Sequence, residues 1–348
     1  MLVLVTGGTG FVGSHTVAAV SAAGHTVRVF ARDANAVEKA LAPLRVPSSA
    51  VEVALGDVTD EAAVTRAVRG TDAVVHAASI YSFDSRRYKQ TRRTNVLGTE
   101  TVLAAAWRAG VARTIYVSTF GALMPASGGL VSPFSPPSNA REPYLASKAR
   151  SEMIARGHQV KGAPVAITYP PALLGPADPK LGDQTMRLRN TLRGLMPVWP
   201  DGGFPIGDVR DTAALHAAVL ETPAETDDRF FGPGRYLSTR AYLGVVRAVT
   251  GRSLPSVFLP ARAMLPFAFA ASMFQRVWPW HIPAEYGACY VCALNARPIP
   301  TTPVLGLPTR QISTTVADTV NWLAQTGRLT ARQAGRAGNR AELGALTI

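Results

Sequence analysis

The sequence predicts an α/β protein with a doubly wound parallel sheet and a smaller, irregular C-terminal lobe. In the first half of the chain, short apolar and β-branched runs alternate with segments of helical length. Uniformly apolar strands of this kind are typical of a parallel sheet that helices cover on both faces. After residue 169 the sequence becomes rich in proline and aromatic residues, and this change predicts the separate lobe.

Six strands are expected before that change, and helices are expected between them over segments such as 11–23 and 60–69. The strands are "LVLV" (2–5), "TVRVF" (26–30), "VEVA" (51–54), "AVVHA" (73–77), "TIYVS" (114–118) and "PVAITY" (164–169). We therefore expect an α/β domain over 1–170, a smaller lobe over 171–326 from which some chain returns to the sheet, and a basic tail over 327–348. Arginines at 328, 332, 336 and 340 would share one helix face in that tail, which we expect to be solvated.

The composition is that of a folded globular chain, with 47% hydrophobic and 17% charged residues among 348. The net charge of +13 comes mostly from arginine and favours anionic ligands. No basic cluster with interleaved aromatic residues is present, so nucleic acid is not an expected partner. The start "MLVLVTGGTG" does not resemble a signal peptide, and the apolar run 263–274 is shorter than the roughly 20 residues of a membrane span. We expect a cytoplasmic protein, with peripheral membrane contact of the aromatic segment as an alternative.

The two cysteines, Cys289 and Cys292, form the sequence "CYVC". Only His281 lies near them, whereas a zinc site needs about four ligands. We expect no metal and interpret both cysteines as small buried residues.

A glycine-rich turn, "VTGGTGFVG", follows the first predicted strand and opens the first predicted helix. In this context Gly7 permits a tight turn, Gly10 lets the backbone approach a pyrophosphate, and Gly13 allows close packing of helix on strand. The helix N-terminus, with Phe11 and Val12, would face the phosphate charge. The turn predicts a dinucleotide site.

The end of the second strand bears on which dinucleotide binds. An acidic residue there usually holds the ribose of NAD, whereas a cation accommodates the 2′-phosphate of NADP. The sequence "FARD" places Arg32 at this point, which favours NADP(H). In the alternative, Arg32 is merely solvated, Asp33 serves the ribose and the cofactor is NAD(H). After the third strand, "GDVTD" offers Asp57 and Val58 to the adenine, although Asp57 would also suit a helix cap or turn.

The run "NAREPYLASKARSE" places Tyr144 and Lys148 on one face of a predicted helix. Pro143 suits the first turn of that helix, so Tyr144 would also lie near the positive end of the helix dipole. Because an opposite charge favours an ionised phenol, we expect Lys148 to lower the pKa of Tyr144. The alternative is an ordinary pair on an amphipathic helix.

Seven of these motifs together resemble the extended short-chain dehydrogenase/reductases, in order and in spacing. They are "TGGTGFVG", "GDVTD", "VVHAAS", "TNVLGTE", "YVSTFGA", "YLASK" and "PPALLGP". The resemblance covers about residues 1–326 and is greatest to the branch with dihydroflavonol 4-reductase, cinnamoyl-CoA reductase and 3β-hydroxysteroid dehydrogenase. It implies a Rossmann domain followed by a substrate lobe.

The resemblance also implies roles for single residues. Tyr144 is the implied acid/base and Lys148 its partner at the nicotinamide ribose, while Thr119, or less favourably Ser118, matches the catalytic hydroxyl. Asn95 matches an asparagine that steadies the helix beside the active site. Implied cofactor contacts are His76, Ala77, Ala78, Pro170 and Pro171. One departure from the family is Tyr169, where an arginine often precedes the proline.

The expected function is an NADP(H)-dependent oxidoreductase that interconverts a carbonyl and a secondary alcohol on a bulky lipophilic or aromatic molecule. Aromatic and long apolar residues would wall its pocket: Tyr81, Phe83, Phe120, Leu123, Met196 and Trp199, joined by the segment with Phe267, Phe269, Phe274, Trp278 and Trp280. Two alternatives stay open, a nucleotide-sugar epimerase or dehydratase and a cofactor-sensing protein without turnover. A homo-oligomer is possible.

Overall fold

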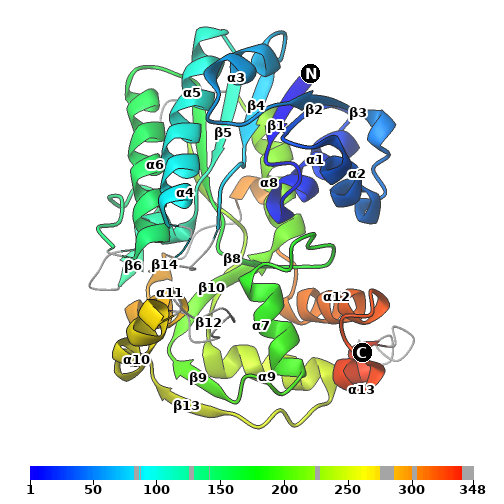
Figure 1. Ribbon diagram of the computed structural model, residues 1–348, viewed down its shortest axis with the longest axis vertical. Helices are drawn as coiled ribbons and strands as arrows, with labels where there is room; N and C mark the ends of the chain where they lie inside the picture. Colours follow the sequence, from blue (N-terminus) through cyan, green and yellow to red (C-terminus); the bar gives the residue numbers. More distant parts are fainter. Residues whose placement is uncertain are drawn as a thin grey trace.

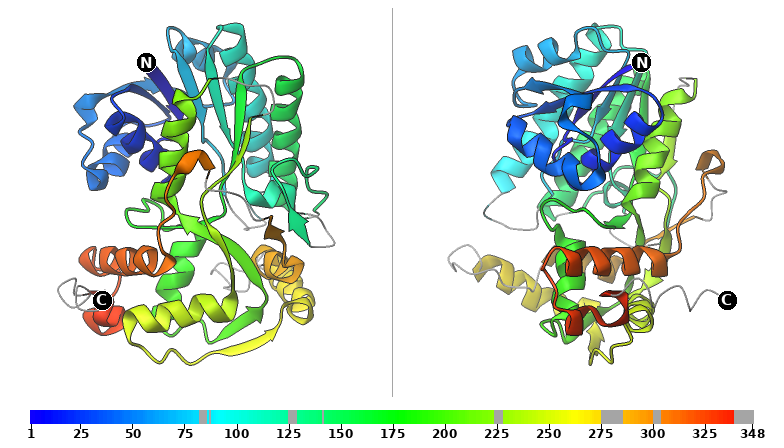
Figure 2. Two further views of the ribbon diagram at one scale, coloured as in Figure 1. Left: turned by 180° about the vertical axis from the view of Figure 1, so that it is seen from behind. Right: turned by 90° about the vertical axis from the view of Figure 1, so that its right-hand side faces the viewer.

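The structure is a computed structural model that describes residues 1–81, 86, 88–124, 129–140, 142–223, 228–274, 286–299 and 304–338, apart from the side chains of 272 and 274. A helix-covered parallel sheet forms the upper domain in Figure 1, and a second lobe lies below the carboxyl ends of its strands. The same two tiers are visible from behind in Figure 2.

The central sheet has seven strands in the order β11-β7-β5-β4-β1-β2-β3, and every neighbouring pair is parallel. The strands are β1 (Leu2–Thr6), β2 (Thr26–Ala31), β3 (Val51–Leu55), β4 (Ala73–His76), β5 (Arg113–Val117), β7 (Val165–Tyr169) and β11 (Arg229–Phe231). The chain winds outward from β1 in both directions, so the order reverses between β1 and β4. The predicted doubly wound sheet and its six expected strands are confirmed, and β11 is the chain that returns from the lobe.

Helices cover both faces of this sheet (Figure 1). One face carries α1 (Phe11–Ala22), α2 (Ala34–Leu41) and α8 (Val209–Glu221), whose apolar side chains pack onto the strands. The other face carries α3 (Glu61–Val68), α5 (Gly98–Arg108) and α6 (Pro143–Val160). A short helix α4 (Tyr88–Arg92) and a π-helical turn η4 (Arg93–Leu97) lead into α5, and short 3₁₀ turns η1 (Ala42–Leu44) and η2 (Ser48–Ala50) precede β3.

The lower lobe is built around a three-stranded sheet of order β12-β10-β8. Its strands are β8 (Ala172–Leu174), β10 (Gly203–Asp208) and β12 (Arg235–Ser238), and a second pair joins β9 (Val198–Asp201) to β13 (Val257–Pro260). Its helices are α7 (Asp183–Leu192), α9 (Thr239–Thr250), α10 (Ala261–Phe274), α11 (Tyr286–Leu294) and α12 (Ile312–Gln325). The short strand β6 (Leu130–Val131) of the upper domain pairs with β14 (Arg297–Pro298) and ties the two parts together.

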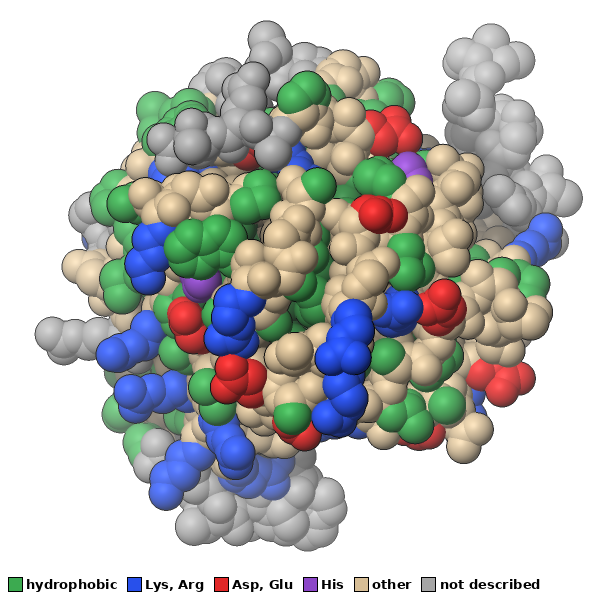
Figure 3. Space-filling model, turned by 90° about the horizontal axis from the view of Figure 1, so that it is seen from above, with side chains coloured by type: hydrophobic (Ala, Val, Ile, Leu, Met, Phe, Trp, Pro, Cys, Tyr) green, Lys and Arg blue, Asp and Glu red, His purple; other side chains and the backbone are tan. Residues whose placement is uncertain are grey.

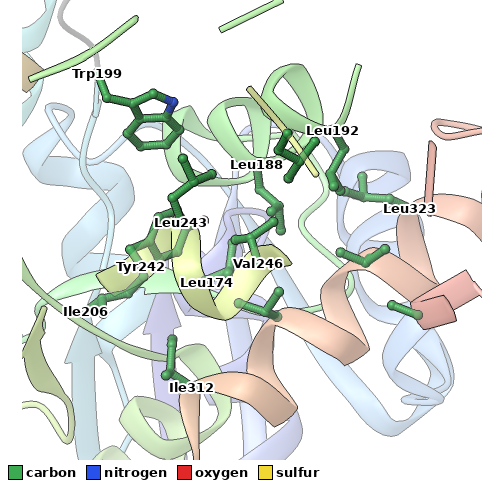
Figure 4. Close-up of a cluster of buried hydrophobic side chains, with 14 of the residues drawn as sticks. Leu174, Leu188, Leu192, Trp199, Ile206, Tyr242, Leu243, Val246, Ile312 and Leu323 are labelled. Atoms are coloured by element: carbon green, nitrogen blue, oxygen red, sulfur yellow. The ribbon is translucent and has the colours of Figure 1, made fainter. Parts of the chain in front are cut away.

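The core of the lobe collects side chains from β8, α7, β9, β10, α9 and α12. Figure 4 shows ten of them labelled, with Trp199 at one end and Leu323 at the other. Trp199 packs against Tyr242 with ring centroids 6.0 Å apart, and its Nε1 donates to the carbonyl of Met196 at 3.1 Å. Trp199 therefore belongs to the core of the lobe.

The basic tail packs onto the lobe as far as residue 338. Leu329, Ala334 and Ala337 are buried in the lobe core, and the guanidinium of Arg336 donates to the carbonyl of Ala248 at 3.3 Å. The helix α13 (Ala331–Ala334) stops at Gly335, whose φ of +58° breaks it before a 3₁₀ turn η7 (Gly335–Gly338). The expectation of a solvated tail is therefore wrong for 327–338, because buried alanines and a leucine lie between its arginines. Arg340 lies outside the described residues.

Surface features bear on two expectations. On the face seen from above, basic and acidic side chains are interspersed (Figure 3). No helix among the described residues is long and apolar enough to cross a bilayer.

The aromatic side chains of α10 do not wall a pocket. This helix extends away from the body of the lobe in the right-hand view of Figure 2, and its Phe267 is 79% and its Phe269 56% exposed. Trp278, Trp280 and the side chain of Phe274 are not described.

A buried histidine behind the sheet makes stability depend on pH. His216 of α8 lies between the hydroxyls of Thr16 (2.8 Å from Nδ1) and Thr168 (3.1 Å from Nε2), and burial lowers its pKa from 6.5 to about 3. Below pH 6.5 the unfolded chain gains a proton here that the folded chain does not, so stability is full above pH 6.5 and falls as pH drops.

We expect the stabilising effect of His216 relative to His216→Gln to shrink by about 2 kcal/mol between pH 7 and pH 5. Urea unfolding of both proteins at the two pH values measures it. An equal difference between the two proteins at both pH values would contradict the assignment.

Candidate active site

A cavity of about 480 Å³ runs along the carboxyl ends of the parallel strands, between the sheet and the lower lobe. It crosses the point between β1 and β4 where the strand order reverses. Open α/β sheets bind ligands at such a switch point. Seventeen of the candidate residues line this cavity. They are Gly7, Gly10, Phe11, Val12, Gly13, Arg32, Asp57, Val58, Ala77, Ala78, Tyr81, Thr119, Phe120, Tyr144, Lys148, Pro170 and Pro171.

The glycine turn leaves an open cradle at one end of the cavity. Gly7 has φ +78°, and a Cβ there would lie 2.6 Å from the backbone nitrogen of Ala78. A Cβ on Gly13 would overlap the carbonyl of Gly7, so α1 can approach β1 only with glycine at this position. Gly10 is the N-cap of α1, no side chain caps the helix, and its first turn contains no acidic residue. Because backbone N–H groups are left to face the cavity, the cradle fits the pyrophosphate of a dinucleotide.

Arg32 and Asp57 lie together at the adenosine end of the cavity. The Arg32 side chain is 70% exposed, and its Nη1 is 3.9 Å from Oδ2 of Asp57. Burial acts to raise the pKa of Asp57, but hydrogen bonds from Thr59 and the charge of Arg32 lower it. Asp57 thus serves both as a turn residue and as part of the cavity wall. Asp33 instead caps α2 by accepting from Asn35 N at 2.9 Å, and it does not line the cavity.

His76 and Asn95 lie behind the cavity wall. His76 is buried at the end of β4, with Nδ1 2.8 Å from the hydroxyl of Thr6, and burial lowers its pKa to about 3. The amide of Asn95 donates to Ile80 O and to Ser147 Oγ, at 3.1 and 3.0 Å, and so joins the loop after β4 to α6. Neither residue reaches the cavity, so the geometry assigns both a supporting position.

The predicted trio of Thr119, Tyr144 and Lys148 converges on the middle of the cavity. Pro143 is the first residue of α6 and Glu142 its N-cap, which confirms the predicted helix start. A hydrogen bond links Tyr144 to Thr119, which lies two residues after the end of β5 at Val117. One turn along α6, the Lys148 ammonium donates to the carbonyl of Val117 at 3.0 Å and lies 5.0 Å from the centre of the Tyr116 ring.

The electrostatics of this trio differ from the expectation that Lys148 lowers the pKa of Tyr144. Burial raises the pKa of the Tyr144 phenol, the charges of Glu142 and Asp183 raise it further, and the hydrogen bond with Thr119 acts in the opposite direction. Burial also lowers the pKa of Lys148 to about 8, against the charge of Glu152. The expectation is therefore wrong for the protein alone, because burial of the phenol raises its pKa and Lys148 is not among the groups that act on it. The Tyr144 phenol therefore keeps its proton through the neutral pH range.

Glu142 is a titratable residue that the sequence did not indicate; it does not line the cavity, but its charge acts on Tyr144. Its carboxylate is buried and accepts from Leu145 N at 2.8 Å, and burial raises its pKa to about 7. An acidic residue immediately before the proline of "EPY" was the available signal, because aspartate and asparagine are the commoner caps.

The expected substrate wall is only partly assembled at the cavity. Tyr81 and Phe120 line it, and the Tyr81 ring meets that of Tyr144 edge-on with centroids 4.8 Å apart. Leu123 is buried beneath the wall, and Trp199 and Met196 border a separate small cavity within the lobe. Phe83 lies outside the described residues.

Other apolar residues complete the wall. They are Met124, Leu173, Phe204 of β10, and Ala288, Val291 and Cys292 of α11. Cys292 is buried, as expected, and burial raises the pKa of its thiol to about 12. Lys180, in the loop before α7, and Asp183 and Arg187 of α7 form a polar rim on the same side. Among the described residues there is no cluster of metal-binding side chains.

The crevice at the switch point and the open glycine turn define the class of protein, a dinucleotide-binding protein of the Rossmann fold. Residues 3–231 match the model of the NAD dependent epimerase/dehydratase family. This chain belongs to that family, so the resemblance found in its motifs is confirmed and its cofactor is a nicotinamide dinucleotide.

Individual relatives are similar over most of their length. Sterol demethylase protein B of Methylococcus capsulatus is 30% identical over 79% of this chain and 83% of its own. A ketoreductase of Stigmatella aurantiaca, named for 4-hydroxy-2-methyl-3-oxo-4-farnesyl-3,4-dihydroquinoline-1-oxide, is 31% identical over 81% of this chain and 82% of its own. The crystal structure of gox2253 superposes with a TM-score of 0.77 at 26% identity, over 94% of this chain and 99% of its own.

Proposed function

We propose that this protein is an NADP(H)-dependent oxidoreductase that interconverts a carbonyl and a secondary alcohol on a bulky lipophilic or aromatic molecule. One observation carries the proposal: the buried phenol of Tyr144 lies between the dinucleotide crevice and an apolar wall, with Thr119 and Lys148 beside it. A neutral phenol at this position is suited to give a proton to a carbonyl oxygen.

Each member of the trio has a distinct part in the reaction. The reduced nicotinamide supplies a hydride when bound. Tyr144 donates its proton to the carbonyl oxygen, and Thr119 donates a hydrogen bond to the same oxygen and orients it. The Lys148 ammonium binds the ribose hydroxyls and stabilises the phenolate that remains, since an opposite charge favours the ionised form. Pro170 and Pro171 line the nicotinamide end, and Asn95 holds the loop after β4 in place.

The preference for NADP(H) over NAD(H) is supported by how Arg32 and Asp33 are used. Arg32 is exposed at the adenosine end of the cavity, whereas the carboxylate of Asp33 is engaged as a helix cap. A guanidinium there suits a 2′-phosphate, and no acidic side chain at the end of β2 is left to bind the ribose hydroxyls.

We expect Arg32→Ala to lower kcat/KM with NADPH about 10- to 100-fold and to leave kcat/KM with NADH within about twofold, because only the phosphate contact is lost. Steady-state kinetics with both cofactors measures the effect. Asp33→Asn is the matched control and should leave the ratio of the two cofactors unchanged. Equal losses with NADPH and NADH in Arg32→Ala would contradict the assignment.

The lipophilic substrate class is supported by the wall and by the relatives. Tyr81, Phe120, Met124, Phe204 and Val291 present aromatic or aliphatic surface to the cavity. The two relatives described above are named for a sterol and for a farnesylated quinoline, both bulky and lipophilic.

A nucleotide-sugar epimerase or dehydratase is the second candidate, because Lys180 and Arg187 give the cavity two cations that suit a diphosphate. A cofactor sensor is the third, although a sensor needs no Tyr–Lys pair at the nicotinamide. Loss of NADPH absorbance with a panel of aromatic ketones, steroids and nucleotide sugars separates them. We expect stoichiometric NADPH consumption with a ketone. Conversion of a nucleotide sugar without net NADPH consumption, or binding without any turnover, would overturn the proposal.

A further inference from the structure

A second buried charge lies one turn beyond Lys148 on α6. The carboxylate of Glu152 has no exposed surface, and it accepts three hydrogen bonds. Ser118 Oγ donates to Oε2 at 2.8 Å, while the hydroxyl of Tyr169 and Nε of Arg156 donate to Oε1 at 2.6 and 2.8 Å. Burying a carboxylate is costly unless it is paired and hydrogen-bonded, so this arrangement is a built one.

The three donors come from elements that each carry part of the active site. Ser118 directly precedes Thr119, and Tyr169 ends β7 directly before Pro170 of the cavity wall. Arg156 lies on α6, the helix that carries Tyr144 and Lys148. One carboxylate thus fixes the ends of β5 and β7 to the catalytic helix.

The same carboxylate faces the lysine of the trio through the protein interior. The titratable groups around Glu152 are Arg156 and Tyr169, which bond to it, and Lys148 and Tyr116, on which its charge acts. Lys148 in turn meets the Tyr116 ring, and its charge acts on buried His76, whose pKa of about 3 keeps it neutral. Burial lowers the pKa of Lys148, whereas the negative charge of Glu152 raises it. Among these groups, Glu152 is therefore the anion that favours the ammonium form of Lys148.

We propose that Glu152 is a positioning residue of the active site, which holds Thr119, Lys148 and Pro170 in register and keeps Lys148 cationic. This inference rests on the proposed function, in which the ammonium binds the ribose and supports proton donation by Tyr144. Glu152 itself touches neither cofactor nor substrate, since it does not line the cavity.

The test is the pH dependence of Glu152→Gln, which keeps the size of the side chain and removes its charge. Without the carboxylate, Lys148 loses its proton at lower pH, so the alkaline limb of kcat/KM for ketone reduction should move down by about one pH unit. At pH 8 this gives about a fivefold loss, and at pH 6 almost none. A purely structural role would lower activity equally at both pH values.

Two further variants separate charge from geometry. Tyr169→Phe removes one hydrogen bond and keeps the carboxylate, so it should lower kcat modestly without moving the alkaline limb. Glu152→Asp keeps the charge, so its alkaline limb should stay at the wild-type pH. This variant keeps the inference testable if Glu152→Gln does not fold. If the alkaline limb of Glu152→Gln coincides with the wild type, or that of Glu152→Asp or Tyr169→Phe moves down by a full unit, the inference is wrong.

A binding measurement distinguishes failure of this inference from failure of the proposed function. NADPH affinity, followed by fluorescence from pH 6 to 9, should weaken at lower pH in Glu152→Gln than in the wild type. That result supports the inference even for a protein that reduces no ketone, in which case only the proposed function falls. Identical pH dependence of NADPH affinity in the two proteins rejects the inference even where ketone reduction is observed.

Discussion

Replacing Tyr144 by phenylalanine is expected to lower kcat for ketone reduction by about 10²- to 10⁴-fold, the usual contribution of a positioned general acid. The substitution removes one hydroxyl and keeps the ring, which packs edge-on against Tyr81. Because burial raises the pKa of this phenol, the wild-type side chain holds its proton through the neutral range, and the variant has no proton to give. NADPH affinity should change by less than about threefold, since the dinucleotide cradle is untouched.

The matched control is Tyr242→Phe, another buried tyrosine, which packs against Trp199 and Phe204 in the core of the lower lobe. It also loses a hydroxyl from the interior but lies outside the cavity, so its kcat should remain within about twofold of the wild type. Single-turnover reduction under saturating NADPH measures both variants. A Tyr144→Phe protein with wild-type kcat would remove the catalytic assignment.

Gly13→Ala is expected to weaken NADPH binding by about 100-fold. A methyl group at this position would overlap the Gly7 carbonyl and lie 2.6 Å from the Gly7 carbonyl carbon, so α1 must move away from the turn that it opens. Overpacking of this kind costs about 1–3 kcal/mol. If about 3 kcal/mol of this cost is lost from the free energy of NADPH binding, the affinity falls by about 100-fold. Titration of NADPH by fluorescence measures the change.

Gly157→Ala serves as the control for Gly13→Ala. Gly157 lies inside α6, and a Cβ there would meet no atom within 4 Å. Alanine should raise the stability of the helix by about 0.5–1 kcal/mol and leave NADPH affinity unchanged. Tight NADPH binding by Gly13→Ala would show that the dinucleotide does not use this turn.

The sheet and the dinucleotide cradle could be predicted because their signals are local. Each of the six expected strands is a short apolar run, and the turn from Gly7 to Gly13 carries its constraints within seven residues. The signal for the start of α6 is equally local, since Pro143 is its first residue.

The substrate wall could not be predicted at the same level. An apolar residue is equally suited to a core and to a pocket, and the side chains of Trp199 and Leu123 are buried in the core. Phe204 and Val291 reach the cavity from strands and helices far along the chain, which no local pattern indicates. The direction of the Tyr144 pKa shift also depends on burial by distant segments, whereas the sequence showed only the neighbouring lysine.

The fate of the transferred hydrogen tests hydride transfer from the cofactor to a ketone directly. A ketone is reduced with NADPH deuterated at the reactive face of the nicotinamide 4-position, and the alcohol is analysed by mass spectrometry. We expect one deuterium on the carbinol carbon for each NADPH consumed by the wild type, whereas Tyr144→Phe should form very little alcohol, labelled in the same way. An alcohol formed without the label, or a product formed with no net oxidation of NADPH, would contradict this expectation.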